Sequence, residues 1–365
     1  MLEEVRVKWI LEKNSVMPIV EFKYGFPLFC SGNAAGTLLK LEKNRVSDLW
    51  ALLDYIIKQF VKYKNSETKE FLLSLHEQAK YFYQAAEQAP VKSQPLLYYY
   101  SFLNLTKAYL CITQGTSPDD VYMHGIETVV NRATSIQAAK VTVKPMSASA
   151  RISVAYSLMA SLGDQLPYLS STDLQIKDCL SSCIGIHRTF CETYDEKESF
   201  VRLLEPKCQR DGKKLDFFAK LKQCDSVTVG ALIAAGFDIR RNGDDYEFHQ
   251  ELNMPGYSIR KQDWEDLSSV LLSKGLRAYT DGNEYRMYLP LSPKVPISST
   301  SVIYSVMFFL GSVTRYHPYF FDSLMDEKEQ WLISEFLNTQ PRQFLYYLIS
   351  YMVGKPIYRS RTAML

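Results

Sequence analysis

Three polar side chains recur at helical spacing in an otherwise apolar segment of the first third of the chain. Ser101, Asn104 and Lys107 lie three residues apart, so their side chains share one face if the segment is helical. Buried polar groups require partners. The three side chains could bind a ligand there, or they could form a hydrogen-bond network that joins this helix to another one.

A second group of candidates combines two imidazoles and one guanidinium. Arg315 and His317 end an apolar run before Pro318, where the dipole of a helix C-terminus stabilises cations and where they could also bind an anion. His124 precedes Gly125 in a region rich in turn residues. Because histidine titrates near neutral pH, Arg315, His317 and His124 are the candidates for catalysis. Structural roles for all three are the alternative.

The richest basic run of the chain lies between Glu205 and Lys222. Its candidate contacts to phosphate groups are Lys207, Arg210, Lys213 and Lys214. The alternative is the solvated face of a helix, which is the commoner origin of such a run. The formal net charge of +2 does not favour nucleic-acid binding.

Two clusters have residue types that bind metals. The first repeats every fourth residue, at Cys179, Cys183, His187 and Cys191. On one straight helix these side chains would spread over about 18 Å, too far for a single ion, and a bend would be needed. The second, Asp244, Asp245 and Glu247, is better explained as the solvated flank of a turn. We predict no metal and no cofactor, and we find no phosphate-binding loop, serine-hydrolase elbow or zinc-protease motif.

Composition limits the class of protein. The chain has 365 residues, of which 47% are hydrophobic and 22% charged, so we expect nearly all of it to fold. An odd number of cysteines, seven, predicts reduced thiols. The acidic start lacks the pattern of an export signal, and no apolar run reaches the roughly 20 residues of a spanning helix. We therefore expect a soluble, cytoplasmic protein that does not span a membrane.

Apolar periodicity predicts helices near both ends of the chain. In the first half it predicts helices over 48–64, 68–88 and 95–111, then a strand over 140–144 and a helical pattern over 170–183. Towards the end it predicts helices over 298–316, 327–337 and 342–352, the last with Thr339 as its cap and Pro341 in its first turn. Each set is too apolar to stand alone, so we expect the two sets to pack together.

The middle of the chain has a different pattern. Asn242-Gly243 and Asp281-Gly282 each separate two strand-like runs, which predicts two β-hairpins, with a helix over 264–274 between them. We therefore predict an α+β protein that is predominantly α-helical, a helical bundle with an inserted α+β section. The predicted parts are an N-terminal helical region, the α+β insertion and C-terminal helices, over 1–180, 181–295 and 296–365.

Three of these segments resemble one family of bacterial proteins. Pro95–Ala108, His124-Gly125 and Arg315–Pro318, in this order, are similar to the YaaC-like proteins, and the resemblance covers most of the chain. It implies a bacterial origin but no established activity. It also implies that Asn104, His124, Arg315 and His317, which are far apart in the sequence, meet in one place.

Three functions remain open at this point, and the sequence does not decide whether the chain is an enzyme. The first is a binding or effector protein of a bacterial antiviral-defence or stress system, which acts with a protein partner through a polar pocket in the bundle. The 25 tyrosines of the chain suit binding surfaces, and enzyme motifs are missing, so both observations favour this hypothesis. An oligomer is compatible with it. The second is a HEPN-like ribonuclease, although Arg315 and His317 are closer together than in such enzymes. The third is a nucleic-acid-binding module.

Overall fold

The N-terminal helices form where the sequence supplies caps and apolar faces. The computed structural model describes residues 5–12, 15–22, 45–130, 135–145, 151–256, 261–281, 284–292, 295, 297–326, 328–354 and 356–359. Helix α1 (Leu49–Phe60) begins at Asp48, whose carboxylate accepts the N–H groups of Trp50 and Ala51. A short 3₁₀ turn (Val61–Tyr63) follows it. Helix α2 (Ser66–Gln88) begins at Asn65 in the same way, and α3 (Gln94–Gln114) ends at Gly115 with a φ of 72°.

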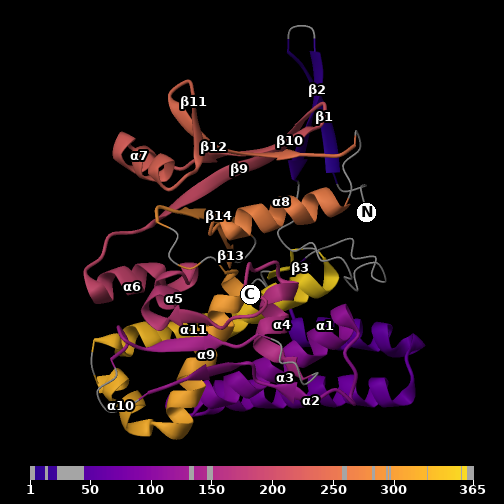
Figure 1. Cartoon of the computed structure of the whole chain (residues 1–365), viewed down its shortest axis with the longest axis vertical. Coiled ribbons are helices and arrows are strands. Elements are labelled where there is room, and N and C mark those ends of the chain that lie inside the picture. Colours follow the sequence, from indigo (N-terminus) through magenta and orange to yellow (C-terminus); the bar gives the residue numbers. More distant parts are fainter. Residues whose placement is uncertain are drawn as a thin grey trace, which may run out of the picture.

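Two helices from the end of the chain pack on α3, as predicted: α9 (Ser299–Tyr316) and α11 (Glu329–Val353). The helix between them, α10 (Pro318–Asp326), packs on α9 and α11. The rings of Phe102 on α3 and Phe344 on α11 stack with their centroids 3.9 Å apart. Helix α3 lies at the centre of this bundle and contacts α2, α9 and α11 (Figure 1). The predicted class, a mostly helical α+β fold, is therefore confirmed.

The helices at the end of the chain differ from the prediction in two respects. The separate helices predicted over 327–337 and 342–352 are a single helix, α11, with Pro341 in its interior and not in a first turn. Proline removes one backbone hydrogen bond, but the helix buries one face before Pro341 and all side chains from Gln343 to Val353 after it, and this packing holds the helix together. Helix α10 fills the stretch before it, where we predicted no element.

An antiparallel sheet lies at the other end of the molecule from the bundle (Figure 1). Its long strands are β9 (Phe200–Asp211) and β10 (Lys214–Leu221), and β10 buries every second side chain from Leu215 to Leu221. The sheet continues from β10 to β12 (Asp245–Asn253) and β11 (Asp238–Asn242). On its other edge β9 pairs with β14 (Glu284–Pro290) and with β2 (Ser15–Phe22), which pairs with β1 (Val5–Glu12).

Both predicted hairpins are present. Strands β11 and β12 turn at Asn242 and Asp245, with Gly243 at a φ of 62°. Strand β13 (Arg277–Asp281) pairs with β14. Helix α8 (Lys261–Ser273) lies between sheet and bundle in Figure 1, and α7 (Ser226–Ala234) lies beside β11. Strands β1 and β2 come from the stretch that we assigned to the N-terminal helical region, and the three domain boundaries stay a prediction.

Short elements complete the bundle. Strands β4 (Tyr122–Met123) and β7 (Ile152–Ser153) are parallel, as are β3 (Arg45–Val46) and β15 (Tyr358–Arg359). A three-stranded sheet contains β5 (Ile126–Thr128), β6 (Lys140–Val143) and β8 (Thr172–Gln175), so the strand predicted over 140–144 is confirmed. The helical pattern predicted over 170–183 is half correct, because β8 precedes α5 (Ile176–Ser181). The remaining helices are α4 (Val154–Ser161), a 3₁₀ turn (Ile184–Ile186) and α6 (His187–Tyr194).

A helix that crosses a bilayer needs about 20 mostly apolar residues. Over the part of the chain that the structure describes, none of them combines the length and the apolar character that a membrane crossing demands.

Candidate functional site

A cavity of about 290 Å³ lies between α3, β5 and the C-terminal end of α9. Its lining includes all three catalytic candidates, His124, Arg315 and His317. Tyr99 and Tyr100 of α3 line it as well. Residues that are nearly 200 positions apart in the sequence therefore share one space, as the resemblance implied for these three.

A glycine sets the spacing of the two helices that form this cavity. A Cβ atom at Gly311 of α9 would lie 3.1 Å from Tyr99 Cβ and 3.2 Å from the carbonyl oxygen of Pro95. Only glycine allows α9 to approach α3 this closely. The Tyr99 ring then meets the edge of Phe308 on α9, with a centroid distance of 5.3 Å and an interplanar angle of 74°. The position of Tyr99 is thus fixed by packing.

His124 is held against Tyr99 by the turn that follows it. Gly125 has a φ of 67°, and Ser153 leaves no space there for a side chain. The His124 ring stacks on Tyr99 at a centroid distance of 5.7 Å, and the Tyr99 hydroxyl is hydrogen-bonded to His124 Nδ1. When the phenol is the donor of this bond, Nδ1 accepts and the proton of the neutral imidazole lies on Nε2.

The electrostatic environment keeps His124 neutral. Burial lowers its pKa below the ordinary value of 6.5, and the nearby cations Lys107 and Arg315 lower it further. Burial also raises the pKa of Tyr99 far above its ordinary range, so this side chain remains a phenol. The cavity therefore offers hydrogen-bond donors and the positive charge of Arg315, which suit an anionic group, while the carboxylate of Glu127 on its lining pairs with Lys144 at 2.5 Å.

Arg315 is oriented at the cavity by two aromatic side chains. Its Nη1 donates to the hydroxyl of Tyr100 over 2.7 Å, and its guanidinium lies 4.9 Å from the ring centroid of Tyr316. Tyr100 is in turn stacked on Phe82 of α2. His317 ends α9 with its N–H bonded to the carbonyl of Val313, and its Nδ1 lies 3.3 Å from the hydroxyl of Tyr319.

None of the three polar residues predicted to share a face of α3, Ser101, Asn104 and Lys107, lines this cavity. Ser101 donates to the carbonyl of Ala79 over 2.8 Å, and Asn104 donates to the side chain of Gln78 over 3.3 Å. Both side chains therefore face α2, so Asn104 does not meet His124 and Arg315. Lys107 lies over the ring of Tyr122 at 5.3 Å, and burial lowers its pKa. It acts on the cavity only through its charge.

The tyrosines were not among the sequence candidates. Tyr99 and Tyr100 belong to the run Tyr98–Tyr100, which is the signal that could have identified them. In a segment that is apolar nearly all round, however, such a run is equally typical of a core helix.

The basic run lies on strands, so the helix face considered for it is wrong. Lys207 and Arg210 belong to β9, and Lys213 and Lys214 lie at the turn into β10. Lys207 is 4.0 Å from Glu205, and Lys214 is 3.2 Å from Glu251. Neighbouring side chains of a strand point to opposite faces. The charges of this run are therefore not gathered on one face, as they would be on a helix.

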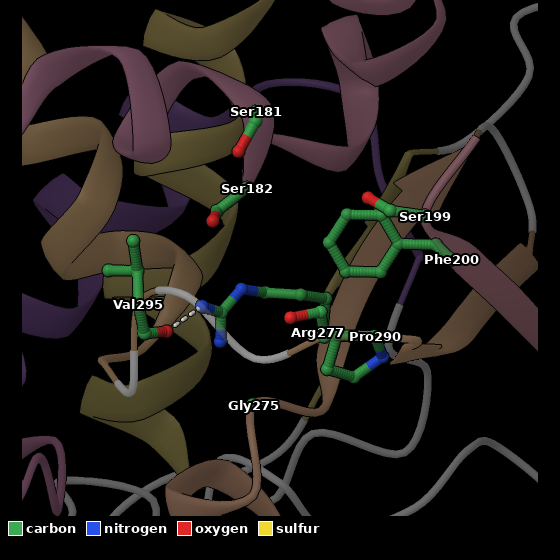
Figure 2. A pocket seen from close by; sticks show the side chains of 9 residues that line it. Ser181, Ser182, Ser199, Phe200, Gly275, Arg277, Pro290 and Val295 are labelled. Carbon is green, nitrogen blue, oxygen red and sulfur yellow. Dashed lines mark hydrogen bonds between the residues drawn. The ribbon is translucent and has the colours of Figure 1, made fainter. Parts of the chain in front are cut away.

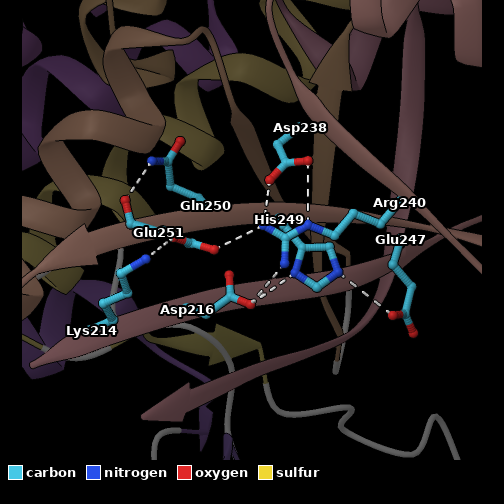
Figure 3. A network of polar contacts seen from close by, with 8 residues as sticks. All are labelled: Lys214, Asp216, Asp238, Arg240, Glu247, His249, Gln250 and Glu251. Carbon is cyan, nitrogen blue, oxygen red and sulfur yellow. Dashed lines mark hydrogen bonds and ion pairs between the residues drawn. The ribbon is translucent and has the colours of Figure 1, made fainter. Parts of the chain in front are cut away.

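Acidic residues surround the same face of the sheet (Figure 3). Arg240 pairs with Asp238 at 2.6 Å and with Glu251 at 2.9 Å. His249 lies 2.8 Å from Asp216 and 3.7 Å from Glu247, and its ring stacks on Phe218. The charges here are mixed, which does not favour phosphate contacts over this part of the sheet.

The repeated cysteines and His187 have structural partners. Helix α5 ends at Ser181 and α6 begins at His187, so the four residues are not on one helix. His187 Nδ1 is 2.7 Å from the carbonyl oxygen of Ser181, and its Nε2 accepts the N–H of Ser199 over 3.1 Å. Within the described ranges no three His, Cys, Asp or Glu residues are grouped so that they could hold a metal ion.

Comparisons with known proteins give one match. The model of the YaaC-like protein family matches residues 42–352, and all three motifs of the resemblance lie inside this range, so the resemblance is confirmed. No curated protein and no solved structure matches the chain.

Proposed function

This chain belongs to the YaaC-like protein family, and from this premise we propose that it is a binding protein whose cavity receives an anionic group of a protein partner. The observation that carries the proposal is that His124, Arg315 and His317 line one cavity together with Tyr99 and Tyr100. In this proposal Arg315 neutralises the anion and His124 Nε2 donates a hydrogen bond to it. Tyr99 acts through His124, because its hydroxyl orients the imidazole.

Two features support a protein as the carrier of the anion. The cavity volume of about 290 Å³ is at the lower limit of small-molecule sites, and it is sufficient for one side chain or a terminal carboxylate. Beside the cavity, Tyr316 and Tyr319 are exposed by 63% and 47%. Exposed tyrosines are enriched in the contact regions of protein interfaces. We infer that an acidic anchor enters the cavity while the partner covers these rings.

Photo-crosslinking tests this proposal directly. A benzoylphenylalanine at position 316 should give a defined crosslinked product in cells, which mass spectrometry identifies. The same group at Tyr168, which is exposed by 70% but is not among the residues that line the cavity, is the matched control. Adding Arg315→Gln should abolish the product from position 316. The proposal fails if both positions give the same products, or if the product is unaffected by Arg315→Gln.

A small anion without a protein is the competing occupant. Isothermal titration with phosphate, citrate and adenosine monophosphate distinguishes it, because the proposal expects no saturable binding of these compounds at micromolar concentrations. Tight binding that is lost in Arg315→Gln would replace the protein partner with a metabolite. An acidic peptide taken from the crosslinked partner should instead bind, and should bind less tightly to Arg315→Gln.

RNA cleavage is a second candidate function. Two imidazoles and a guanidinium in one cavity are the groups that acid–base cleavage of a phosphodiester uses. Labelled RNA should then be cleaved by the wild-type protein and not by His124→Ala or by Arg315→Ala with His317→Ala. Equal cleavage by wild type and variants would indicate a contaminating nuclease.

Two further expectations stay predictions. A bacterial antiviral-defence or stress setting would be tested by the genes that neighbour this one. Nucleic-acid binding through Lys207, Arg210, Lys213 and Lys214 would be tested by a salt-dependent gel shift that weakens in Lys213→Glu with Lys214→Glu.

A further inference from the structure

Strand β11 lies at one edge of the large sheet, at the end of the molecule away from the bundle (Figure 1). On one side it pairs with β12, and in the described part of the sheet no strand pairs with its other side. Four of its five residues are exposed, and Ile239 is half-buried. An open edge of this kind presents backbone N–H and C=O groups to which another strand can bind.

The turn of the β11–β12 hairpin decides which backbone groups face this open edge. Asn242 pairs with Asp245 across a two-residue turn, and residues that flank such a turn exchange both backbone hydrogen bonds. Back along β11 in steps of two, the even-numbered residues therefore point their backbone groups at β12. The N–H and C=O groups of Ile239 and Arg241 point away from β12, and within the described ranges no group binds them.

The other predicted hairpin of the sheet is closed to a further strand. Strand β13 pairs with β14 on one side, and on the other Tyr347 of α11 donates to the carbonyl of Ala278. Arg277, the first residue of β13, is buried where the sheet meets the bundle, and its Nη2 donates to the carbonyl of Val295 (Figure 2). A second chain can therefore reach the backbone of β11 and not that of β13.

Two opposite charges stand side by side on the exposed face of β11. Asp238 and Arg240 are two residues apart, so they lie on the same face of the sheet, and they form an ion pair at 2.6 Å (Figure 3). Charged side chains on an edge strand usually keep other strands away. Because these two charges have opposite signs, they instead select the register in which another strand can pair.

An antiparallel copy of β11 supplies the complementary charges in one register. The register can be centred on each of the three interior residues of the strand. Centred on Ile239, it places Asp238 of each copy opposite Arg240 of the other, and it joins the outward backbone groups of the two Ile239 residues. Centred on Arg240 or on Arg241, it places two arginines opposite each other, which is unfavourable.

From this geometry we infer that β11 is the interface of a homodimer, in which a second copy of this chain pairs antiparallel about Ile239 and the two large sheets become one. The N–H of Arg241 in each copy then donates to the carbonyl of Phe237 in the other. The paired strands are short, so the dimer dissociates on dilution. This inference is independent of the function proposed for the cavity, which lies in the bundle.

Sedimentation equilibrium of the full chain tests the dimer. The mass of the wild type should rise from monomer to dimer with concentration. Asp238→Arg and Arg240→Asp should each stay monomeric, because like charges then face each other across the interface. An equimolar mixture of these two variants should restore the dimer, since arginines of one chain face aspartates of the other. Lys214→Asp, which changes an exposed charge of β10 two strands away from the edge, should dimerise like the wild type.

Disulfide trapping covers the case in which the charge variants do not fold. Ile239→Cys should link two copies under mild oxidation, because the Cα atoms of such a central pair lie about 5.5 Å apart. Arg241→Cys should not link, since in this register its counterpart is four residues further along the ladder. The inference is overturned if the wild type is monomeric at every concentration, if the mixture of charge variants does not restore the dimer, or if both cysteine variants link equally.

Discussion

At the scale of single residues, the candidate site depends on the protonation of one imidazole. Burial and the nearby cations favour the neutral form of His124, and this form donates from Nε2 when Nδ1 accepts the hydrogen bond from Tyr99. The cations therefore have two roles: they attract an anion, and they prevent His124 from becoming a further cation.

The first prediction concerns the pKa of His124. Arg315→Gln should raise this pKa, because it removes a positive charge that disfavours protonation. The pKa should stay below 6.5, because burial, which is the largest cause of its lowering, remains in the variant. Imidazole signals followed by NMR during a pH titration would measure it, and the chain has only five histidines to assign. Arg188→Gln, a change on exposed α6 surface, is the control, and an equal shift in both variants would contradict the prediction.

A second prediction concerns Asp164, which holds the start of α9. Burial raises its pKa to about 6 despite the hydrogen bonds from Ser298 and Ser301. The folded chain thus binds this proton more tightly than the unfolded chain, whose carboxyl titrates near pH 4. The contribution of this carboxyl to the free energy of unfolding is fully present below about pH 4. It falls by roughly 3 kcal/mol as the pH rises to 6.

Asp164→Asn should remove this pH dependence. The free energy of unfolding of the variant, relative to the wild type, should increase between pH 4 and pH 7 in urea titrations. Asp225→Asn provides a comparison of opposite sign, because hydrogen bonds from Thr228 lower the pKa of Asp225. There the wild type should gain stability over its variant as the pH rises. Parallel curves for both variants would refute the assignment.

At the scale of secondary-structure elements, the cavity depends on the close contact of α3 and α9. Gly311→Ala should destabilise the fold by about 1–3 kcal/mol, because the new methyl group would press on Tyr99 and Pro95. Gly230→Ala on α7 is the matched control. No atom lies within 4 Å of its added Cβ, so the better helix propensity should stabilise the chain by about 0.5–1 kcal/mol. Denaturation midpoints would show the opposite signs, and equal effects would contradict the argument.

Local sequence patterns correctly predicted those elements whose formation depends mainly on neighbouring residues. Asn242-Gly243 specifies its hairpin because few other dipeptides adopt that turn, and the structure has it there. The charged strands β9 and β10 were missed, since the run of basic residues was interpreted as a solvated helix face although β10 alternates buried and more exposed residues as a strand does. Pro341 misled the assignment of α11 because the packing that overrides a proline is not local.

The candidate site was predictable only in part, for a related reason. Periodicity correctly placed Ser101 and Asn104 on one face, but the choice of the helix that covers this face depends on the whole bundle. The meeting of His124 with Arg315 and His317 came from the family resemblance. Tyr99 becomes part of the site only through its contact with α9, which the local sequence of α3 does not specify.

At the scale of the whole molecule, α11 joins the bundle to the sheet. Strand β13 pairs with β14 on one side, and on the other its backbone is bonded to side chains of α11. Gln343 donates to the carbonyl of Thr280 over 2.7 Å and accepts its N–H over 3.4 Å. These contacts satisfy the open edge of the strand.

The last prediction tests this connection. Gln343→Met should lower the free energy of unfolding by roughly 2 kcal/mol, because it leaves a buried N–H and a buried carbonyl of Thr280 without partners. The amide of Thr280 should also exchange faster with deuterium. Gln340→Met is the control, since the Gln340 amide donates to Thr339 beside it in α11. A similar loss in both variants would show that the contact to β13 has no special role.

The central place of α3 also has a consequence for synthesis on the ribosome. Helix α2 covers one side of α3 and α9 covers another, and the ribosome has to add residues 115–298 before α9 begins. At translation rates of about 5–20 residues per second, the side that α9 covers stays unburied for about 10–40 s. During that interval the exposed apolar surface makes the nascent chain prone to aggregation.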